Sequence, residues 1–399
     1  MRPIPHTAGV YLAALQFVFA LGWTVYAIYL PQLAAAVGLP SGAVIVILML
    51  DQAIFTMTDF AMGVAADKVS HLVGRLSHWV AAVTLVSCAA FVGLPFVARG
   101  AGVTVFLALT AVWAVTSSAL RAPPLMLLGK YAARPAIPYL ASLAMLGLGL
   151  AGAVSPYLAM TLTRQDPRLP FVLASVALVL TSLVLVKVER SLAKQAPAKT
   201  EAPQTVDRAV PAPVVVFALA MVIFALGFQL HVFFNSAPKF RHFSTDISKL
   251  MPLFSVGFCV GMFPASRITK RFGGLPVMGA AALLGAIAIA AMEIASTLDF
   301  AVAAQLIAGA AWGAILMSAF AVAAALGYTG TEGKTTGVLF SALALATFAR
   351  MAASASGMLG DPSLAPLLRW APIVCWAAGG VMLLALTVGR MGPAAPAET

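Results

Sequence analysis

The sequence predicts an all-α membrane protein in which twelve membrane-spanning helices form two bundles of six. Of its 399 residues, 62% are hydrophobic and only 9% are charged, whereas soluble domains carry roughly 25% charged residues. Twelve apolar runs follow one another along the chain, and helices of ~20 residues can cross a ~30 Å hydrocarbon core while satisfying their own backbone hydrogen bonds. Sequence features of the first half also recur in the second half. Together these observations exclude a soluble fold.

The first run is too long for the apolar core of a signal peptide, and no small-residue cleavage site follows it, so we expect it to remain as the first helix. None of the runs alternates with period two, as the strands of a β-barrel would. In order, we expect spans at residues 8–30, 41–66, 77–98, 101–128, 136–161, 169–188, 211–236, 250–266, 275–296, 299–326, 335–358 and 369–389.

The formal net charge of +11 comes from basic residues scattered through short loops, without aromatic interleaving, so no nucleic-acid partner is expected. Lys and Arg are more frequent in the alternate loops that share a side with the termini. By the positive-inside rule, both termini are expected in the cytoplasm, with the chain in a bacterial inner membrane. The three cysteines lie inside apolar runs without metal-ligand spacing, and no catalytic or nucleotide motif is present. We therefore expect no enzyme activity, cofactor or metal.

A polar segment at 189–210, rich in Ala, Pro and Lys, is expected to be a cytoplasmic linker between bundles at 1–188 and 211–399. The tetrapeptide that starts at Phe19 recurs at Phe224, an offset of 205 residues, and Trp113 recurs as Trp312, an offset of 199. Because each half has an even number of spans, the two copies have the same orientation in the membrane. This predicts two parallel bundles related by an axis along the membrane normal.

The loop after the second span carries Gly63, Asp67 and Lys68, followed by Gly74-Arg75. It resembles the signature loop of the major facilitator superfamily, Gly-x-x-x-Asp-Arg/Lys-x-Gly-Arg-Arg. The first three residues match in place, whereas Gly74-Arg75 is displaced and no second Arg follows. The resemblance covers essentially the whole chain. It implies a secondary transporter that works by alternating access, with a midplane cavity between spans 1, 4, 7 and 10.

Five charged residues lie inside the expected spans: Asp51, Asp59, Arg121, Glu293 and Arg350. Each costs at least ~2.5–3.5 kcal/mol to insert, so each needs a partner or a function. Asp59 and Arg121 lie at matched depths, ~12–14 Å above the cytoplasmic ends of their helices, and we expect them to form an ion pair. Either the pair is a structural tie, or Arg121 faces the cavity and attracts an anion or modulates a titrating Asp59. Glu293 is expected to be structural.

Asp51 and Arg350 both lie ~24 Å from the cytoplasmic ends, and the resemblance places their spans side by side. We hypothesise that they pair when the outer side closes and separate when it opens. The alternative is that Asp51 bonds only to Gln52 or nearby hydroxyl groups. Because burial raises a carboxylate pKa and a nearby Arg lowers it, Asp51 and Asp59 are the candidate proton carriers.

Candidate substrate-binding residues lie at helical spacing on the first and seventh spans. The fourth and tenth spans add further candidates. An aromatic stripe of this kind also fits core packing or an interfacial belt, so both interpretations stay open. The candidates are Gln16, Trp23 and Tyr26 on span 1, Trp113 and Arg121 on span 4, Phe228, His231 and Asn235 on span 7, and Gln305 and Trp312 on span 10.

The sequence predicts a transporter that moves a small organic solute, with protons as the expected coupling ion. The Gly-rich run from Gly147 to Pro156 resembles an antiporter motif and gives a slight preference for efflux, although close helix packing explains it as well. One alternative is import of a small organic anion with Arg121 as counter-charge. Another is a sensor or assembly subunit without net flux. We expect a monomer in the bilayer.

Overall fold

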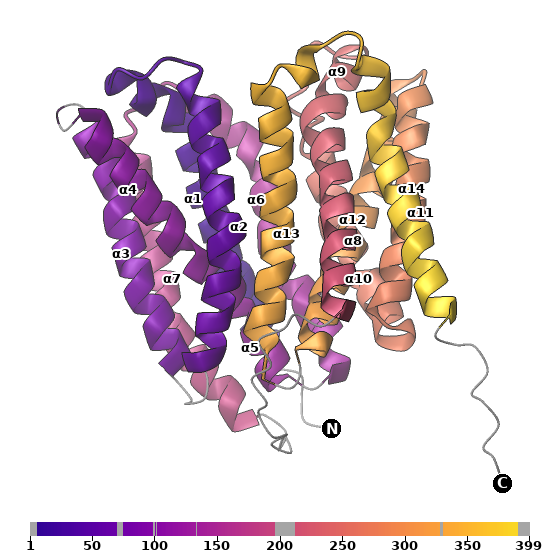
Figure 1. Cartoon of the computed structure of the whole chain (residues 1–399), viewed down its shortest axis with the longest axis horizontal. Coiled ribbons are helices and arrows are strands. Elements are labelled where there is room, and N and C mark those ends of the chain that lie inside the picture. Colours follow the sequence, from indigo (N-terminus) through magenta and orange to yellow (C-terminus); the bar gives the residue numbers. More distant parts are fainter. Residues whose placement is uncertain are drawn as a thin grey trace.

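The computed structural model describes residues 6–69, 75–98, 100, 102–132, 134–195, 212–327 and 330–389. These residues form helices without any strand, and the helices stand side by side in two groups (Figure 1). We call the side on which α2 ends and α13 begins the lower side, as drawn in Figure 1. The all-α fold of two six-helix bundles predicted from sequence is confirmed.

The first bundle contains the six expected spans, with ends shifted by a few residues. Its fourth span is divided into α4 and α5. The elements are α1 (His6–Ala36), α2 (Ala43–Val69), α3 (Arg75–Val97), α4 (Gly102–Ser117), η1 (Ser118–Leu120), α5 (Ala122–Tyr131), η2 (Arg134–Ala136), α6 (Ile137–Leu162) and α7 (Arg168–Gln195).

The fourth span breaks because two consecutive prolines follow it. Pro123 and Pro124 lack the N–H groups that would bond four residues back, and their rings crowd the carbonyl groups there. The chain passes through one turn of 3₁₀ helix, and Arg121 occupies the joint between η1 and α5. The carbonyl group of Leu120, which Pro124 cannot bond, accepts a hydrogen bond of 3.2 Å from Gln16 Nε2. The expected span at 101–128 is therefore present, as Gly102–Tyr131, with a break in its helix at Arg121.

The second bundle repeats the arrangement without a break in its fourth helix, although its first span contains a π turn. The elements are α8 (Ala212–Leu230), the π turn η3 (His231–Asn235), α9 (Ser236–Arg241), α10 (Leu253–Phe272), α11 (Gly274–Ile294), α12 (Leu298–Leu326), α13 (Glu332–Ala355), η4 (Met358–Gly360) and α14 (Ala365–Gly389).

Eleven segments of the described residues are long and apolar enough to cross a membrane. The remaining span, α10, has a lower mean hydropathy because Arg267, Lys270 and Arg271 are concentrated at its lower end. Directly after it, Gly273 adopts a φ of +86°, a conformation that glycine reaches without steric cost, and this permits the tight turn into α11.

The bundles meet along two seams, one between α2 and α13 and the other between α6 and α10. In the α2–α13 seam the helix backbones touch, because a Cβ atom on Gly63 would lie 2.2 Å from the carbonyl oxygen of Gly333. In the α6–α10 seam a Cβ atom on Gly149 would lie 2.5 Å from Cys259 Sγ. The glycines of α6 therefore permit close helix packing, one of the two interpretations of that run.

The lower end of α7 extends into the segment that we expected to be linker. Glu189 is fully buried. Its carboxylate accepts hydrogen bonds from the backbone N–H of Ser77, at 3.0 Å, and from the Tyr131 hydroxyl group, at 3.3 Å. The helix α7 continues to Gln195, seven residues beyond the expected end of the first bundle at residue 188. The rest of the expected linker lies outside the described residues.

Candidate functional site

Asp59 and Arg121 form an ion pair in the lower half of the first bundle. Arg121 Nη1 lies 3.2 Å from Asp59 Oδ2, and the Asp59 side chain is 0% exposed while that of Arg121 is 14% exposed. Neither carboxylate oxygen has a well-oriented hydrogen bond within the described residues. The negative charge of Asp59 is therefore balanced mainly by a single guanidinium group. Protonation of the Asp59 carboxylate would remove that charge and leave Arg121 without its counter-ion.

The Arg121 guanidinium group also bridges the two bundles. Its Cζ atom lies 4.6 Å from the ring centre of Phe55 in α2 and 5.3 Å from that of Phe340 in α13. Both distances fall within the range of cation–π contacts. Arg121 thus connects a carboxylate of the first bundle with an aromatic side chain of the second.

Below this pair, Asp67 joins the end of α2 to the beginning of α13. Asp67 Oδ1 accepts a hydrogen bond of 2.7 Å from the Gly333 N–H, and Oδ2 accepts one of 2.8 Å from the Lys334 N–H. These are N–H groups of the first turn of α13, which have no partner within the helix and attract negative charge. Gly63 and Asp67 of the signature loop therefore hold the bundles together at their lower ends.

The other signature-loop residues are placed only in part. Lys68 is exposed in the last turn of α2. Gly74 and the side chain of Arg75 lie outside the described residues.

In the upper half of α2, Asp51 turns into its own bundle. The Tyr26 hydroxyl group donates a hydrogen bond of 2.7 Å to Asp51 Oδ2, and both side chains are buried. The hypothesised contact with Arg350 is not formed in this structure. The physical reason is that α1 supplies a buried hydroxyl group at the same depth, which corresponds to the second interpretation of Asp51.

Arg350, in α13, is held by its own bundle. Its Nε atom donates a hydrogen bond of 2.9 Å to Gln229 Oε1, and its Cζ atom lies 4.9 Å from the ring centre of Phe233. Gln229 Nε2 in turn donates a hydrogen bond of 2.8 Å to Thr347 Oγ1. Within the described residues, the guanidinium group has no carboxylate partner.

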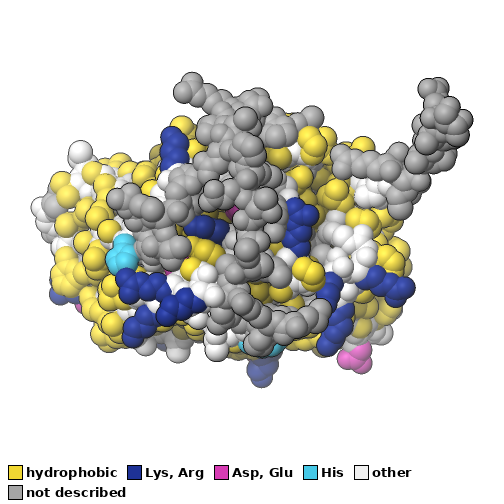
Figure 2. Space-filling model, turned by 90° about the horizontal axis from the view of Figure 1, so that it is seen from below, with side chains coloured by type: hydrophobic (Ala, Val, Ile, Leu, Met, Phe, Trp, Pro, Cys, Tyr) yellow, Lys and Arg dark blue, Asp and Glu magenta, His cyan; other side chains and the backbone are white. Residues whose placement is uncertain are grey.

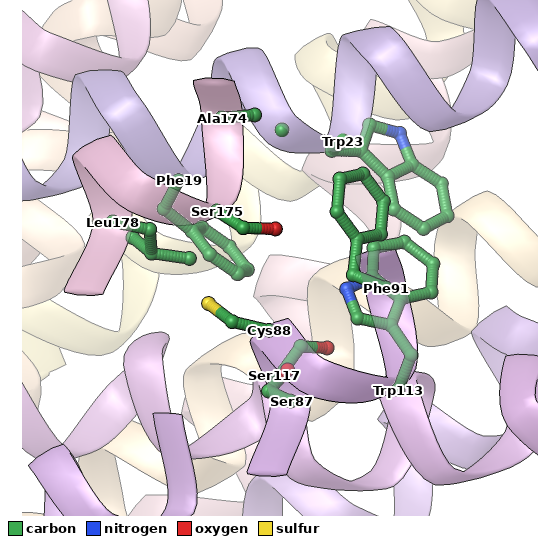
Figure 3. A pocket seen from close by; sticks show the side chains of 11 residues that line it. Phe19, Trp23, Ser87, Cys88, Phe91, Trp113, Ser117, Ala174, Ser175 and Leu178 are labelled. Carbon is green, nitrogen blue, oxygen red and sulfur yellow. The ribbon is translucent and has the colours of Figure 1, made fainter. Parts of the chain in front are cut away.

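The aromatic candidates of the first bundle form one cluster. Trp23 stacks on Trp113 with ring centres 5.7 Å apart, and it also contacts Phe55 at 5.5 Å. Trp23 and Trp113 border a cavity of about 20 Å³, together with the Ser175 hydroxyl group (Figure 3). That volume holds about one water molecule. This cavity is therefore too small for an organic solute.

The second bundle contains the related stack, in which Phe228 lies 4.7 Å from Trp312 with an angle of 5° between the rings. Above it, His231 Nε2 and Gln305 Oε1 are 2.9 Å apart, and Gln305 Nε2 donates to Ser236 Oγ at 3.2 Å. His231 and Gln305 are buried between helices. The π turn at His231 thus belongs to a polar network inside the bundle.

Two further candidates hold helices together. Gln16 caps the break in the fourth span, as described above, and Asn235 Nδ2 donates to the Arg369 carbonyl group at 3.1 Å. Glu293 pairs with Arg369, with Nε and Oε2 2.5 Å apart.

A groove of about 800 Å³ opens between the lower ends of the bundles, bordered by Arg134 on one side and Lys270 on the other. Figure 2 shows the same face from below, with Lys and Arg side chains distributed around it. The charged side chains visible on this face are therefore mostly basic.

The match to known families covers most of the chain: residues 12–351 match the model of the Major Facilitator Superfamily. The chain belongs to the major facilitator superfamily. Membership makes it a secondary transporter and an integral, multi-pass membrane protein rather than an enzyme. Among curated proteins, none matches the sequence.

Several solved structures of superfamily transporters share the fold. A bacterial homologue of the iron transporter ferroportin, in an outward-facing state, has a TM-score of 0.73 at 13% identity, covering 96% of this chain and 99% of that one. The proton:xylose symporter XylE gives 0.67 at 15% identity, over 96% and 95%. The E. coli fucose:proton symporter FucP gives 0.65 at 14% identity, over 94% and 98%.

The sequence did not reveal the hydrogen-bond partners of Asp51 and Arg350. Tyr26 was treated as a pocket residue rather than the partner of Asp51, and Gln229 and Thr347 were not considered. Both are polar residues inside apolar helices, a signal that could have directed attention to Arg350. The break at Arg121 could have been predicted from Pro123-Pro124.

Proposed function

We propose that this protein moves a small organic solute across a bacterial inner membrane by alternating access, coupled to protons, with the lower side in the cytoplasm. The observation that carries the proposal is the buried Asp59–Arg121 pair, because it lies where the first bundle contacts α13. The basic character of the lower face supports the orientation.

Protonation of Asp59 removes the negative charge that holds Arg121 in place. The guanidinium group is then a buried cation without a counter-ion, a costly state that favours movement of Arg121 toward water or toward an anion. Since Arg121 also contacts Phe340, its movement removes a contact across the α2–α13 seam. A proton on Asp59 thus favours separation of the lower ends of α2 and α13.

Efflux by proton exchange is the direction that the α6 glycines favour, through their resemblance to the antiporter motif. The second candidate, import of an organic anion with Arg121 as counter-charge, is less favoured because Asp59 already balances Arg121.

The test is solute-driven proton movement in proteoliposomes containing a pH-sensitive dye, screened over a panel of organic solutes. We expect a solute that changes the internal pH with wild-type protein and fails to do so with Asp59→Asn. Asp299→Asn, at an exposed position on the upper side, serves as the matched control. Proton movement that is equal in wild type and Asp59→Asn would remove Asp59 from the coupling mechanism.

A further inference from the structure

Arg350 differs from two other arginines of the bundles, Arg121 and the half-exposed Arg369. Arg121 pairs with Asp59 and Arg369 pairs with Glu293, but the Arg350 guanidinium group has no carboxylate partner within the described residues. A cation in a membrane-spanning helix is costly, and such residues face a bundle interior or a water-filled cavity and commonly mark a binding site. Because Arg350 has no counter-ion within the described residues, the geometry is consistent with a negatively charged ligand that supplies it.

The contacts of Arg350 leave one edge of the guanidinium group available. Nε is bonded to Gln229, and one face of the plane lies over Phe233. Neither Nη1 nor Nη2 has an acceptor within the described residues. These two nitrogens form the fork that binds the two oxygens of a carboxylate in parallel hydrogen bonds.

A chain of hydrogen bonds fixes this orientation. Thr347 Oγ1 donates to the Leu343 carbonyl group at 2.9 Å, so it is free to accept from Gln229 Nε2. That bond directs Gln229 Oε1 toward Arg350. The guanidinium group is therefore held in place before any ligand arrives, which lowers the entropic cost of binding.

The depth of the site suits access from the upper side. Arg350 lies eighteen residues after Glu332 and Gln229 seventeen after Ala212, which puts both backbones ~26 Å above the lower ends of their helices. Asp51 lies at a similar depth in α2, where Tyr26 holds it. The acid closest in depth is thus engaged in its own bundle and does not neutralise Arg350.

The neighbouring side chains describe the rest of the ligand. Phe233 lies beside the guanidinium group and contacts Phe228, with ring centres 6.1 Å apart, and Phe228 stacks on Trp312. A ligand with a carboxylate and an apolar or aromatic body could bind the guanidinium group through the carboxylate and contact these aromatic rings through its body. We infer that Arg350, positioned by Gln229, binds the carboxylate of an organic anion with an apolar body. This inference rests on the proposed transport function and names its substrate class.

The test measures binding without flux. Purified full-length protein in detergent, at one fixed pH, is heated in the presence of matched acid and amide probes: benzoate and benzamide, phenylacetate and phenylacetamide, hexanoate and hexanamide. We expect at least one acid to raise the melting temperature when its amide does not. Arg350→Gln should weaken that binding roughly 10- to 100-fold, the effect of losing hydrogen bonds to a charged group.

Two variants serve as controls. Arg241→Gln, at an exposed position at the end of α9, should leave acid binding unchanged. Arg350→Lys keeps the charge but lacks the fork, so it should bind the acid more weakly than wild type and more strongly than Arg350→Gln. If Arg350→Gln does not fold, Arg350→Lys carries the test.

The inference is overturned if no acid stabilises the wild type more than its amide, or if the stabilisation persists in Arg350→Gln. Its failure is distinguishable from failure of the proposed function. If the wild type binds no acid but still moves protons in an Asp59-dependent way, only the anion site is removed. Acid binding without Asp59-dependent proton movement removes the coupling proposal instead.

Discussion

The two halves of the α2–α13 seam use their charged residues differently. In the lower half, Arg121 is balanced by Asp59 and contacts Phe340 across the seam, while Asp67 binds the first turn of α13. In the upper half, Asp51 and Arg350 are held by Tyr26 and Gln229 of their own bundles. The lower half is thus closed by charges that act between bundles, whereas the upper half keeps its charges within each bundle.

This difference suits the two functions that a transporter combines, a gate and a substrate-binding site. A closed gate requires interactions that cross the seam, and a binding site requires groups whose partners are absent until the ligand arrives. The α2–α13 seam, together with Arg121 of the fourth span, provides the first near its lower end, and α13 provides the second near its upper end. Four predictions test this comparison.

The largest effect is expected for Arg121→Ala. It leaves Asp59 buried without a counter-ion, so we expect a loss of ~3–5 kcal/mol of unfolding free energy, measured by chemical unfolding in detergent. The double variant Asp59→Asn/Arg121→Ala should recover most of that loss, because no buried charge remains. If the double variant is as unstable as Arg121→Ala, the ion pair is not the reason for the loss.

Gly63→Ala should open the closed end. The added methyl group meets the Gly333 backbone, so we expect overpacking of ~1–3 kcal/mol, relieved by separation of the lower ends of α2 and α13. The measurement is faster labelling, from the lower side, of a cysteine introduced at Thr336, which is buried near the lower end of α13. Gly22→Ala is the control, because a Cβ atom there has no atom within 4 Å. Equal labelling in both variants would contradict a closed lower half.

Tyr26→Phe removes the partner of Asp51 and little volume. We expect a cost of ~1–3 kcal/mol for the unsatisfied buried acceptor, measured by thermal unfolding. Tyr157→Phe, at an exposed position in α6, should have no measurable effect. An equally small effect of Tyr26→Phe would mean that Asp51 finds another partner, and the upper half would then be less fixed than the structure indicates.

The smallest effect is expected from the gate hypothesis. If Asp51 and Arg350 pair in a state with closed upper ends, then Asp51→Asn and Arg350→Gln should raise upper-side labelling of introduced cysteines by a similar factor. We expect this factor to stay within ~10-fold, because each residue exchanges one polar partner for another and the net gain is ~1 kcal/mol. Unchanged labelling in both variants would leave each residue with a role in its own bundle only.

The fold could be predicted almost completely from the sequence, because hydropathy and chain length determine where helices can cross a bilayer. The matched depths of Asp59 and Arg121 followed from helical rise alone, and the structure places the two side chains together. Helix ends were less predictable. The last turns of α7 contain Glu189, whose partners Ser77 and Tyr131 are far from it in sequence.

The candidate site was less predictable. Which residues a polar side chain can contact depends on the rotation of its helix about the helix axis as well as on its depth in the membrane. Asp51 and Arg350 share a depth, yet each points to a partner in its own bundle. Likewise, Gln16 and His231 lie on the expected helices but bond within the bundle interior. The spacing of residues along a sequence shows which side chains share one face of a helix. It does not show which neighbouring helix carries a hydrogen-bond partner for them.

The break at Arg121 has a consequence for how the chain enters the membrane. At ~1.5 Å per residue, the 16 residues of α4 and the 10 of α5 are each too short to cross a ~30 Å hydrocarbon core. Only the whole segment from Gly102 to Tyr131 is long enough. We therefore expect it to integrate into the bilayer as one unit. Gln16 of α1 and Asp59 of α2 contact the break, so packing of α1 and α2 against this segment completes the site.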